Sequence, residues 1–175
     1  ARILGLEYPG GPAIAREARR YNEEILLQGK PIKLPRPMIN QKNYDFSFSG
    51  LKTAVLYQYK NQPPKVRKSK QYIQATCHEI QQAVIDVLIK KTILAAKNFK
   101  AKTIIVGGGV AANRELQKQF KEKVRKETPN TRYLTPSAKL CTDNAAMISI
   151  TGYFHQREKN KKYKKIKANA NLRLS

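Results

Sequence analysis

The stretch KTIIVGGGVAANRE, residues 102–115, carries the clearest structural pattern in the sequence. Residues 103–106 are a short run of β-branched residues without polar alternation, which is typical of a strand buried on both faces. Gly107, Gly108 and Gly109 follow at once, and a helical 3.6-residue pattern of apolar positions begins after them. The sequence therefore predicts a buried strand, a glycine turn and a helix in that order.

Such a corner is able to bind a phosphate group. Glycine lets backbone N–H groups approach a ligand because no Cβ stands in the way, and a new helix offers unpaired N–H groups with a partial positive charge. Gly107, Gly109 and Ala112 fit the loose G-x-G-x-x-G/A spacing of dinucleotide-binding folds, but residues 132–135 lack the acidic residue that this fingerprint requires. No Gly-Lys-Ser/Thr follows, so a P-loop is excluded. A tight turn without a ligand is the alternative.

The composition points to a polyanionic partner. The chain has 175 residues, 41% of them hydrophobic, and 35 basic against 12 acidic residues give a net charge of +23. Such an excess attracts nucleic acid first, with an anionic membrane surface or a generally basic composition as alternatives. No stretch is long and apolar enough to cross a bilayer, and no signal peptide is visible. Cys77 and Cys141 suggest no disulfide framework, so we expect a reducing, cytoplasmic setting.

Two strands are convincing, at residues 103–107 and 131–135. Two strands are too few for a self-sufficient α/β sheet, so we expect the carboxy-terminal part of a longer chain. Helices are predicted from Pro12 to about Gln28, after Ser49, over residues 69–97, after Gly109, and after Thr142 or Asp143, with a basic linker at 60–70. We expect one domain over residues 1–158 and a basic tail over 159–175 that suits nucleic acid.

Several single residues have two interpretations. Gly10 and Gly11 either turn the chain or expose backbone to a ligand. Phe46 and Phe48 either anchor the core, which we favour, or face a partner. Asp143 either caps the helix after it or, at the ligand edge of a sheet, holds a metal.

His78 has no neighbouring ligand residues, so we expect no metal there, and Cys77 lies on the apolar stripe of its helix.

Five segments resemble the carboxy-terminal half of the TsaD family, the threonylcarbamoyltransferases that modify tRNA, formerly called glycoproteases. They occur in the family's order and are residues 4–12 (LGLEYPGGP), 35–38 (PRPM), 45–53 (DFSFSGLKT), 107–113 (GGGVAAN) and 141–147 (CTDNAAM). The resemblance implies an actin-like, sugar-kinase-like fold of two lobes around a nucleotide cleft. This chain would supply mostly second-lobe elements, with a helical majority.

The resemblance also implies site residues and a reaction. Gly11 and Asn113, with the turn at 107–109, would contact threonylcarbamoyl-AMP, and Asp143 would bind one divalent metal, usually Fe²⁺. The threonylcarbamoyl group would be transferred to N6 of adenosine-37 in tRNAs that read codons starting with A. Accessory proteins of the tRNA threonylcarbamoylation complex would be further partners, and a membrane would not.

The chain departs from the family pattern at several points. It lacks the H-x-x-x-H motif that supplies two metal ligands, the Ser-Gly-Gly-His loop, and an Asp just upstream of residues 4–6. Some relatives carry a carboxylate where this chain has Ala15. We therefore expect an incomplete active site in this polypeptide alone. Two alternatives stay open: a non-catalytic tRNA-binding fragment, and a relative on the same fold that uses ATP or carbamoyl phosphate. No Ser/His/Asp set or H-E-x-x-H motif supports a protease.

Overall fold

A computed structural model describes residues 1–22 and 31–156. The chain divides into two compact units, residues 1–141 and the part from residue 142 onward. The predicted boundary at 158–159 and the basic tail lie outside the described residues and stay predictions.

The first unit is built around one long helix, α4 (Lys70–Asn98). The helix starts where the Ser69 hydroxyl accepts a hydrogen bond from the Tyr72 amide at 3.3 Å, which confirms the longest predicted helix. Cys77 and Val87 are fully buried on the predicted apolar stripe, but Ile85 and Ile93, which lie off it, are buried too. The helix is therefore enclosed on several sides rather than along one face.

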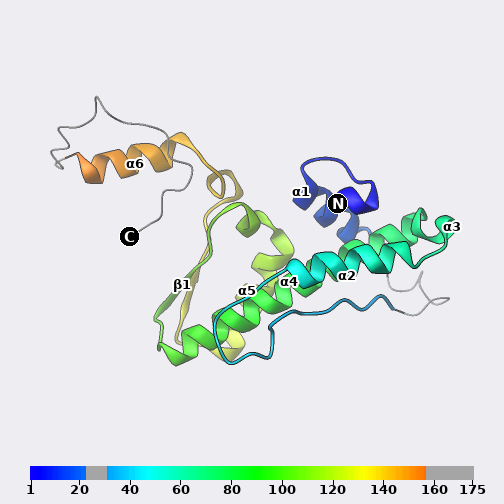
Figure 1. The fold of residues 1–175 in the computed structure, drawn as a ribbon. Coiled ribbons are helices and arrows are strands. Elements are labelled where there is room, and N and C mark those ends of the chain that lie inside the picture. Colours follow the sequence, from blue (N-terminus) through cyan, green and yellow to red (C-terminus); the bar gives the residue numbers. More distant parts are fainter. Residues whose placement is uncertain (23–30, 157–175) are drawn as a thin grey trace, which may run out of the picture. The chain divides into compact units, whose positions relative to one another are not determined.

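Helix α4 is the longest helix of the first unit (Figure 1), and three hydrophobic clusters include its residues. Near its start, Tyr72 and Cys77 pack against Leu4 and Ala18 of the amino-terminal segment. In its middle, Ala83 packs with Leu34, Leu51 and Val55, and towards its end the partners are Ile104, Leu116, Phe120 and Val124. The elements that supply these side chains are η1 (Arg2–Leu4), α1 (Gly10–Arg19), α2 (Ser49–Lys60), β1 (Thr103–Ile105) and α5 (Arg114–Glu127). One helix thus packs against these five elements of the unit.

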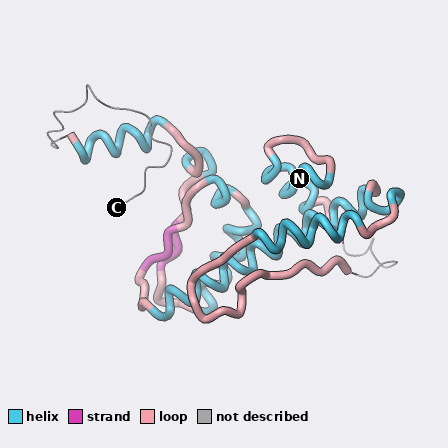
Figure 2. Tube along the Cα trace, in the orientation of Figure 1, coloured by secondary structure: helices cyan, strands magenta, loops and turns pink. Residues whose placement is uncertain are grey.

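The sheet has two parallel strands, β1 and β2 (Arg132–Leu134), with Ile104 opposite Tyr133 (Figure 2). Both predicted strands are confirmed, and the α5 crossover between them is the usual connection of parallel strands. The prediction that β1 is buried on both faces is wrong, since Ile104 is 7% exposed and Ile105 is 73% exposed. Helices α4 and α5 cover one face only. The architecture is α/β, helix-rich with a small parallel sheet.

Local differences from the predictions have plain causes. Helix α1 ends at Arg19 rather than near Gln28, and residues 23–30 lie outside the described part. The predicted basic linker contains a short helix, α3 (Pro64–Arg67), because Pro64 suits a first helical position. Phe48 packs against the core as favoured, but Phe46 is 52% exposed, and its ring lies 5.8 Å from the Phe48 ring between centroids.

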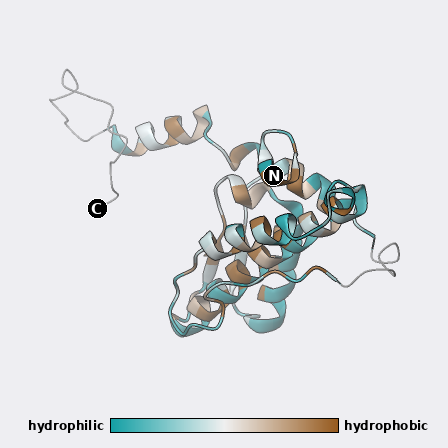
Figure 3. Ribbon diagram, turned by 45° about the vertical axis from the view of Figure 1, so that its right-hand side comes forward, coloured by the Kyte–Doolittle hydropathy of each residue, from teal (hydrophilic) through white to brown (hydrophobic). Residues whose placement is uncertain are grey.

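The second unit contributes α6 (Ala145–His155). Neither Thr142 nor Asp143 caps it: the Asn144 side chain accepts from the Met147 amide at 3.1 Å. No α6 residue is buried, and the helix is apolar along most of its length (Figure 3). Even so, none of the helices within residues 1–22 and 31–156 has the length and hydrophobicity needed to cross a membrane.

Candidate functional site: two glycine corners and an aspartate

The first corner follows β1 and leaves its glycines open. Gly107, Gly108 and Gly109 are exposed, and a Cβ placed on Gly107 or Gly108 would meet no atom within 4 Å. Gly108 has φ +84°, a conformation that other residues rarely adopt. Internal packing therefore does not explain Gly107, whereas backbone conformation explains Gly108.

The sequence predicts a helix directly after these glycines, but α5 begins only at Arg114. A 3₁₀ turn, η3 (Gly109–Ala112), intervenes, and Asn113 is then extended at φ −69°, ψ 115°. The reason is capping: the Asn113 Oδ1 accepts a hydrogen bond from the Leu116 amide at 3.0 Å and so starts α5.

Asn113 is also held from the other side. Its Nδ2 donates to Gln81 Oε1 of α4 at 2.9 Å. A side-chain amide has two N–H donors and two acceptor lone pairs, so one of each stays available after these two bonds. Asn113 is thus fixed in orientation and still able to bond a ligand. Gln81 was not predicted as a site residue, because no local sequence pattern indicates a residue that acts through a distant partner.

The second corner is the start of α1. A Cβ on Gly10 would lie 2.8 Å from the Ala1 Cβ, so a close approach within the chain requires this glycine. A Cβ on Gly11 would meet nothing within 4 Å, and Gly11 is exposed. No side chain caps α1, whose preceding residue is Pro9, so its first N–H groups stay open to an external acceptor. The helix includes Gly10 and Gly11, with Pro12 in its first turn as predicted.

Helix α1 and Asn113 contact neighbouring turns of α4. Cys77 packs in the cluster that holds α1, and Gln81, one turn further on, bonds Asn113. One α-helical turn is about 5.4 Å. Helix α4 therefore contacts both the helix that starts at the second corner and the residue that ends the first.

A polar network lies beside this framework. Arg36 of the 35–38 segment binds Asp86 Oδ2 at 2.9 Å and also contacts Glu79, and Glu79 accepts from the Leu34 amide at 2.9 Å. The hydrogen bond that the Arg36 guanidinium donates to Glu79 raises the pKa of Arg36, against the opposing effect of burial. The network ties an irregular segment to α4. Its signal in the sequence was the PRPM segment itself, whose role the sequence analysis left unassigned.

Asp143 is exposed and forms no hydrogen bond or ion pair with the described residues. Since Asn144 takes the capping role, the Asp143 carboxylate is available to an external cation. A carboxylate oxygen is a suitable ligand for a hard divalent metal. Within residues 1–22 and 31–156, however, no group of three or more His, Cys, Asp or Glu side chains is placed to hold a metal. Asp143 therefore fits as one ligand of a set that needs others.

His78 and the two cysteines lie in packed surroundings. The His78 ring stacks on Tyr21 at 4.6 Å between centroids. Cys77 and Cys141 are free and buried, as expected for Cys77. Burial raises the pKa of the Cys77 thiol to about 11, so this group is an unreactive part of the core.

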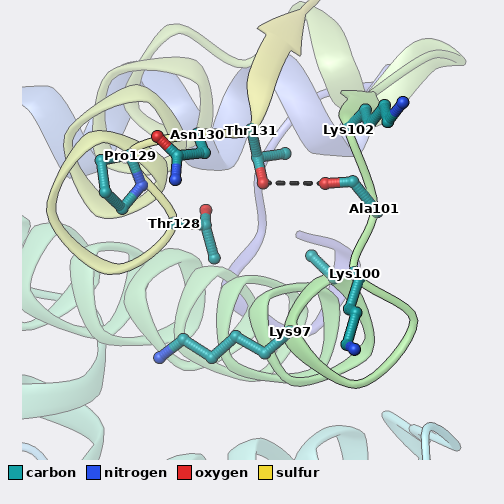
Figure 4. Close-up of a pocket in the computed structure, with 9 residues that line it drawn as sticks. Lys97, Lys100, Ala101, Lys102, Thr128, Pro129, Asn130 and Thr131 are labelled. Carbon is teal, nitrogen blue, oxygen red and sulfur yellow. Dashed lines mark hydrogen bonds between the residues drawn. The ribbon is translucent and has the colours of Figure 1, made fainter.

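A pocket of about 290 Å³ lies elsewhere, at the amino ends of the two strands (Figure 4). Two hydroxyls that line it are already bonded: Thr131 Oγ1 donates to Ala101 O at 2.9 Å, and Thr128 Oγ1 to Val124 O at 3.2 Å. The ammonium group of Lys97, which also lines the pocket, pairs with Glu127 at 2.8 Å. The glycine turn follows the opposite ends of the strands, so this pocket is separate from it.

Comparison with known proteins settles the family. The profile described as "TsaD: tRNA N6-adenosine threonylcarbamoyltransferase" matches residues 1–150. The chain belongs to the TsaD family. It is similar to proteins named tRNA N6-adenosine threonylcarbamoyltransferase. One from Desulfotalea psychrophila is 46% identical over 154 residues, and one from Thermosipho africanus is 44% identical over 153 residues. A third, from Endomicrobium trichonymphae, is 42% identical over 174 residues.

These alignments differ in how much of each protein they cover. The alignments with the first two relatives cover 87% of this chain, but only 42% and 43% of the length of those relatives. The third alignment covers 99% of this chain and 47% of its relative. The chain therefore spans less than half the length of the TsaD relatives it matches.

Proposed function

We propose that this chain forms part of an enzyme that transfers a threonylcarbamoyl group to N6 of adenosine-37 in tRNAs reading codons that start with A. The supporting observation is the TsaD match over residues 1–150, which includes both glycine corners. At each corner a glycine faces open space, as a backbone contact with a ligand requires. The +23 charge suits the RNA substrate.

The proposed donor is threonylcarbamoyl-AMP, held in the cleft of an actin-like, sugar-kinase-like fold. The backbone N–H groups at Gly11 and at Gly107, Gly108 and Gly109 would contact the adenylate. The remaining donor and acceptor of Asn113 would bond it as well, with Gln81 keeping the amide in position. These groups bind and orient the donor, and orientation is itself a large source of rate enhancement.

The proposed reaction is an acyl transfer. The N6 amine of the adenosine attacks the carbamoyl carbonyl carbon, a new C–N bond forms, and the bond from that carbon to the phosphate oxygen breaks. AMP leaves with the bonding electron pair, and the amine loses one proton to solvent or to a base. Asp143 would hold one divalent metal, Fe²⁺ in our proposal, with two histidines from outside this sequence. Such an ion, when bound, polarises the group under attack. We place the reaction in the cytoplasm, with accessory proteins of the modification complex.

The test is a transfer assay on the protein isolated from the cells that naturally produce it. Threonylcarbamoyl-AMP labelled in threonine is mixed with unmodified tRNA, and the label in the tRNA is counted beside the AMP released. We expect one AMP for each label incorporated, at adenosine-37. Asn113→Ser, which keeps a helix-capping side chain, should reduce transfer while tRNA binding persists.

Two results would contradict the proposal. Salt-dependent tRNA binding without any transfer would indicate a binding module, the alternative that the net charge supports. Protection against heating by ATP or carbamoyl phosphate, but not by threonylcarbamoyl-AMP, would indicate a relative with another substrate.

A further inference from the structure

Helix α5 carries four basic side chains on one stripe: Arg114, Lys118, Lys121 and Arg125. Their spacing of four, three and four residues puts them within about 60° of the helix circumference and along about 16 Å of its axis. All four are exposed. The buried side of the helix, with Leu116, Phe120 and Val124, faces away from this stripe.

The acidic residues of α5 leave this stripe unneutralised. Glu115 accepts a hydrogen bond from Gln119 at 2.8 Å, and Glu127 pairs with Lys97 and Lys123. Glu122 lies one turn from Lys118 and Arg125 but forms no ion pair with either. Among the described residues, no carboxylate lies within ion-pair distance of the four basic groups.

The stripe begins beside the candidate adenylate site. Arg114 directly follows Asn113, and the other three cations continue from there along α5. A row of unpaired cations is the arrangement that binds a phosphodiester backbone. We propose that this α5 stripe binds backbone phosphates of tRNA and leads the strand that carries the acceptor adenosine to the glycine corner at residues 107–109. This inference rests on the proposed function and adds the RNA-binding surface to it.

The experiment compares two variants of equal charge. In the first, the four stripe residues are replaced by Gln, which keeps helix propensity. In the second, the control, Gln replaces the exposed lysines Lys60, Lys65, Lys68 and Lys70, which lie at the end of α2, on and after α3, and at the start of α4. Both variants lose four charges and keep the basic tail. Affinity for tRNA is measured from 50 to 200 mM salt by filter binding, with circular dichroism to confirm folding.

Each phosphate contact contributes about 0.7 to 0.9 to the slope of log affinity against log salt, so the stripe variant should lose about 3 from its slope. Over this fourfold change in salt, wild-type affinity should then fall about 60-fold more than that of the stripe variant. The control should keep a slope within about 1 of wild type. Equal losses in the two variants, or a wild-type slope in the stripe variant, would overturn the inference and leave the transferase proposal intact.

Two further outcomes separate this inference from the proposed function. If wild type shows no salt-dependent tRNA binding, both are overturned. If the stripe variant loses its slope as expected but wild type transfers no threonylcarbamoyl group, the binding surface stands and the transferase proposal does not. Equal loss of binding to phosphatidylserine vesicles and to tRNA in the stripe variant would show a general anion surface and overturn the assignment to RNA.

Discussion

Replacing Gly10 and Gly11 separately by Ala should have opposite effects on stability. The two glycines are adjacent at the start of α1, but a Cβ on Gly10 would lie 2.8 Å from the Ala1 Cβ and one on Gly11 would meet no atom within 4 Å. The same chemical change is therefore made once in a crowded place and once in open space.

The expected magnitudes follow from these contacts. For Gly11→Ala, the lower chain entropy of the unfolded state should raise the free energy of unfolding by about 0.4–1 kcal/mol. For Gly10→Ala, a clash between two Cβ atoms forces a backbone shift that costs about 1–3 kcal/mol, which exceeds the same entropic gain. At about 2–4 °C per kcal/mol for a chain of this size, the two melting temperatures should move apart by several degrees.

The assay combines stability with ligand binding. Urea unfolding gives the free energies, and the melting-temperature shift caused by a non-hydrolysable threonylcarbamoyl-AMP analogue gives affinity. Gly11→Ala should be as stable as wild type or more so, yet lose most of the ligand-induced shift, because its methyl group would occupy the space in front of the backbone N–H groups. A lower stability of Gly11→Ala than of wild type would refute the conclusion that a Cβ at Gly11 has free space around it. An undiminished shift in a stable Gly11→Ala would refute the contact between Gly11 and the adenylate.

Three further predictions concern the framework. Asn113→Ala should lower the free energy of unfolding by about 1–2 kcal/mol through loss of the helix cap, and Asn113→Asp should recover most of that loss because Asp is a good cap; urea unfolding checks both. Arg36→Met should lower the free energy of unfolding by about 2–3 kcal/mol, because the Glu79 carboxylate, 15% exposed, loses its cation. A melting temperature that falls by less than about 1 °C would contradict this prediction. Cys77 should resist thiol reagents at pH 8 until the protein unfolds. Because burial raises the pKa of Cys77 to about 11, the unfolded state loses its proton first as pH rises, so stability should fall between about pH 9 and 11 and not below pH 8; Cys77→Ala should remove this pH dependence.

Patterns of apolar residues predicted the elements well where packing acts on a whole segment. The β-branched run at 103–106 formed β1, and the stripe of Leu116, Phe120 and Val124 is buried against the core as the spacing indicates. Glycine and asparagine at 107–113 marked a corner. In each of these cases the signal lies within a few neighbouring residues, so the sequence alone suffices.

Features that depend on what lies across the fold were not predictable in this way. Ile105 follows the same pattern as Ile104 but is exposed, because helices cover one face of the sheet and nothing in the local sequence tells which. Asp143 and Asn144 are both good caps, and the backbone at Asn144 decided between them. The bond from Asn113 to Gln81 joins residues 32 positions apart, which no local pattern reveals.

The long helix α4 explains why these distant contacts matter for a ligand. A helix buried along one face is free to tilt about it, whereas α4 is enclosed by three clusters, and its Glu79 and Asp86 both pair with Arg36. Gln81 therefore presents a fixed acceptor to Asn113, and α1 rests on the turn that contains Cys77. We therefore expect the two open glycine corners, both in elements that contact this enclosed helix, to keep their spacing without the ligand. A site of that kind binds without first having to order its own backbone, which is the condition under which bare backbone amides bind a small anion well.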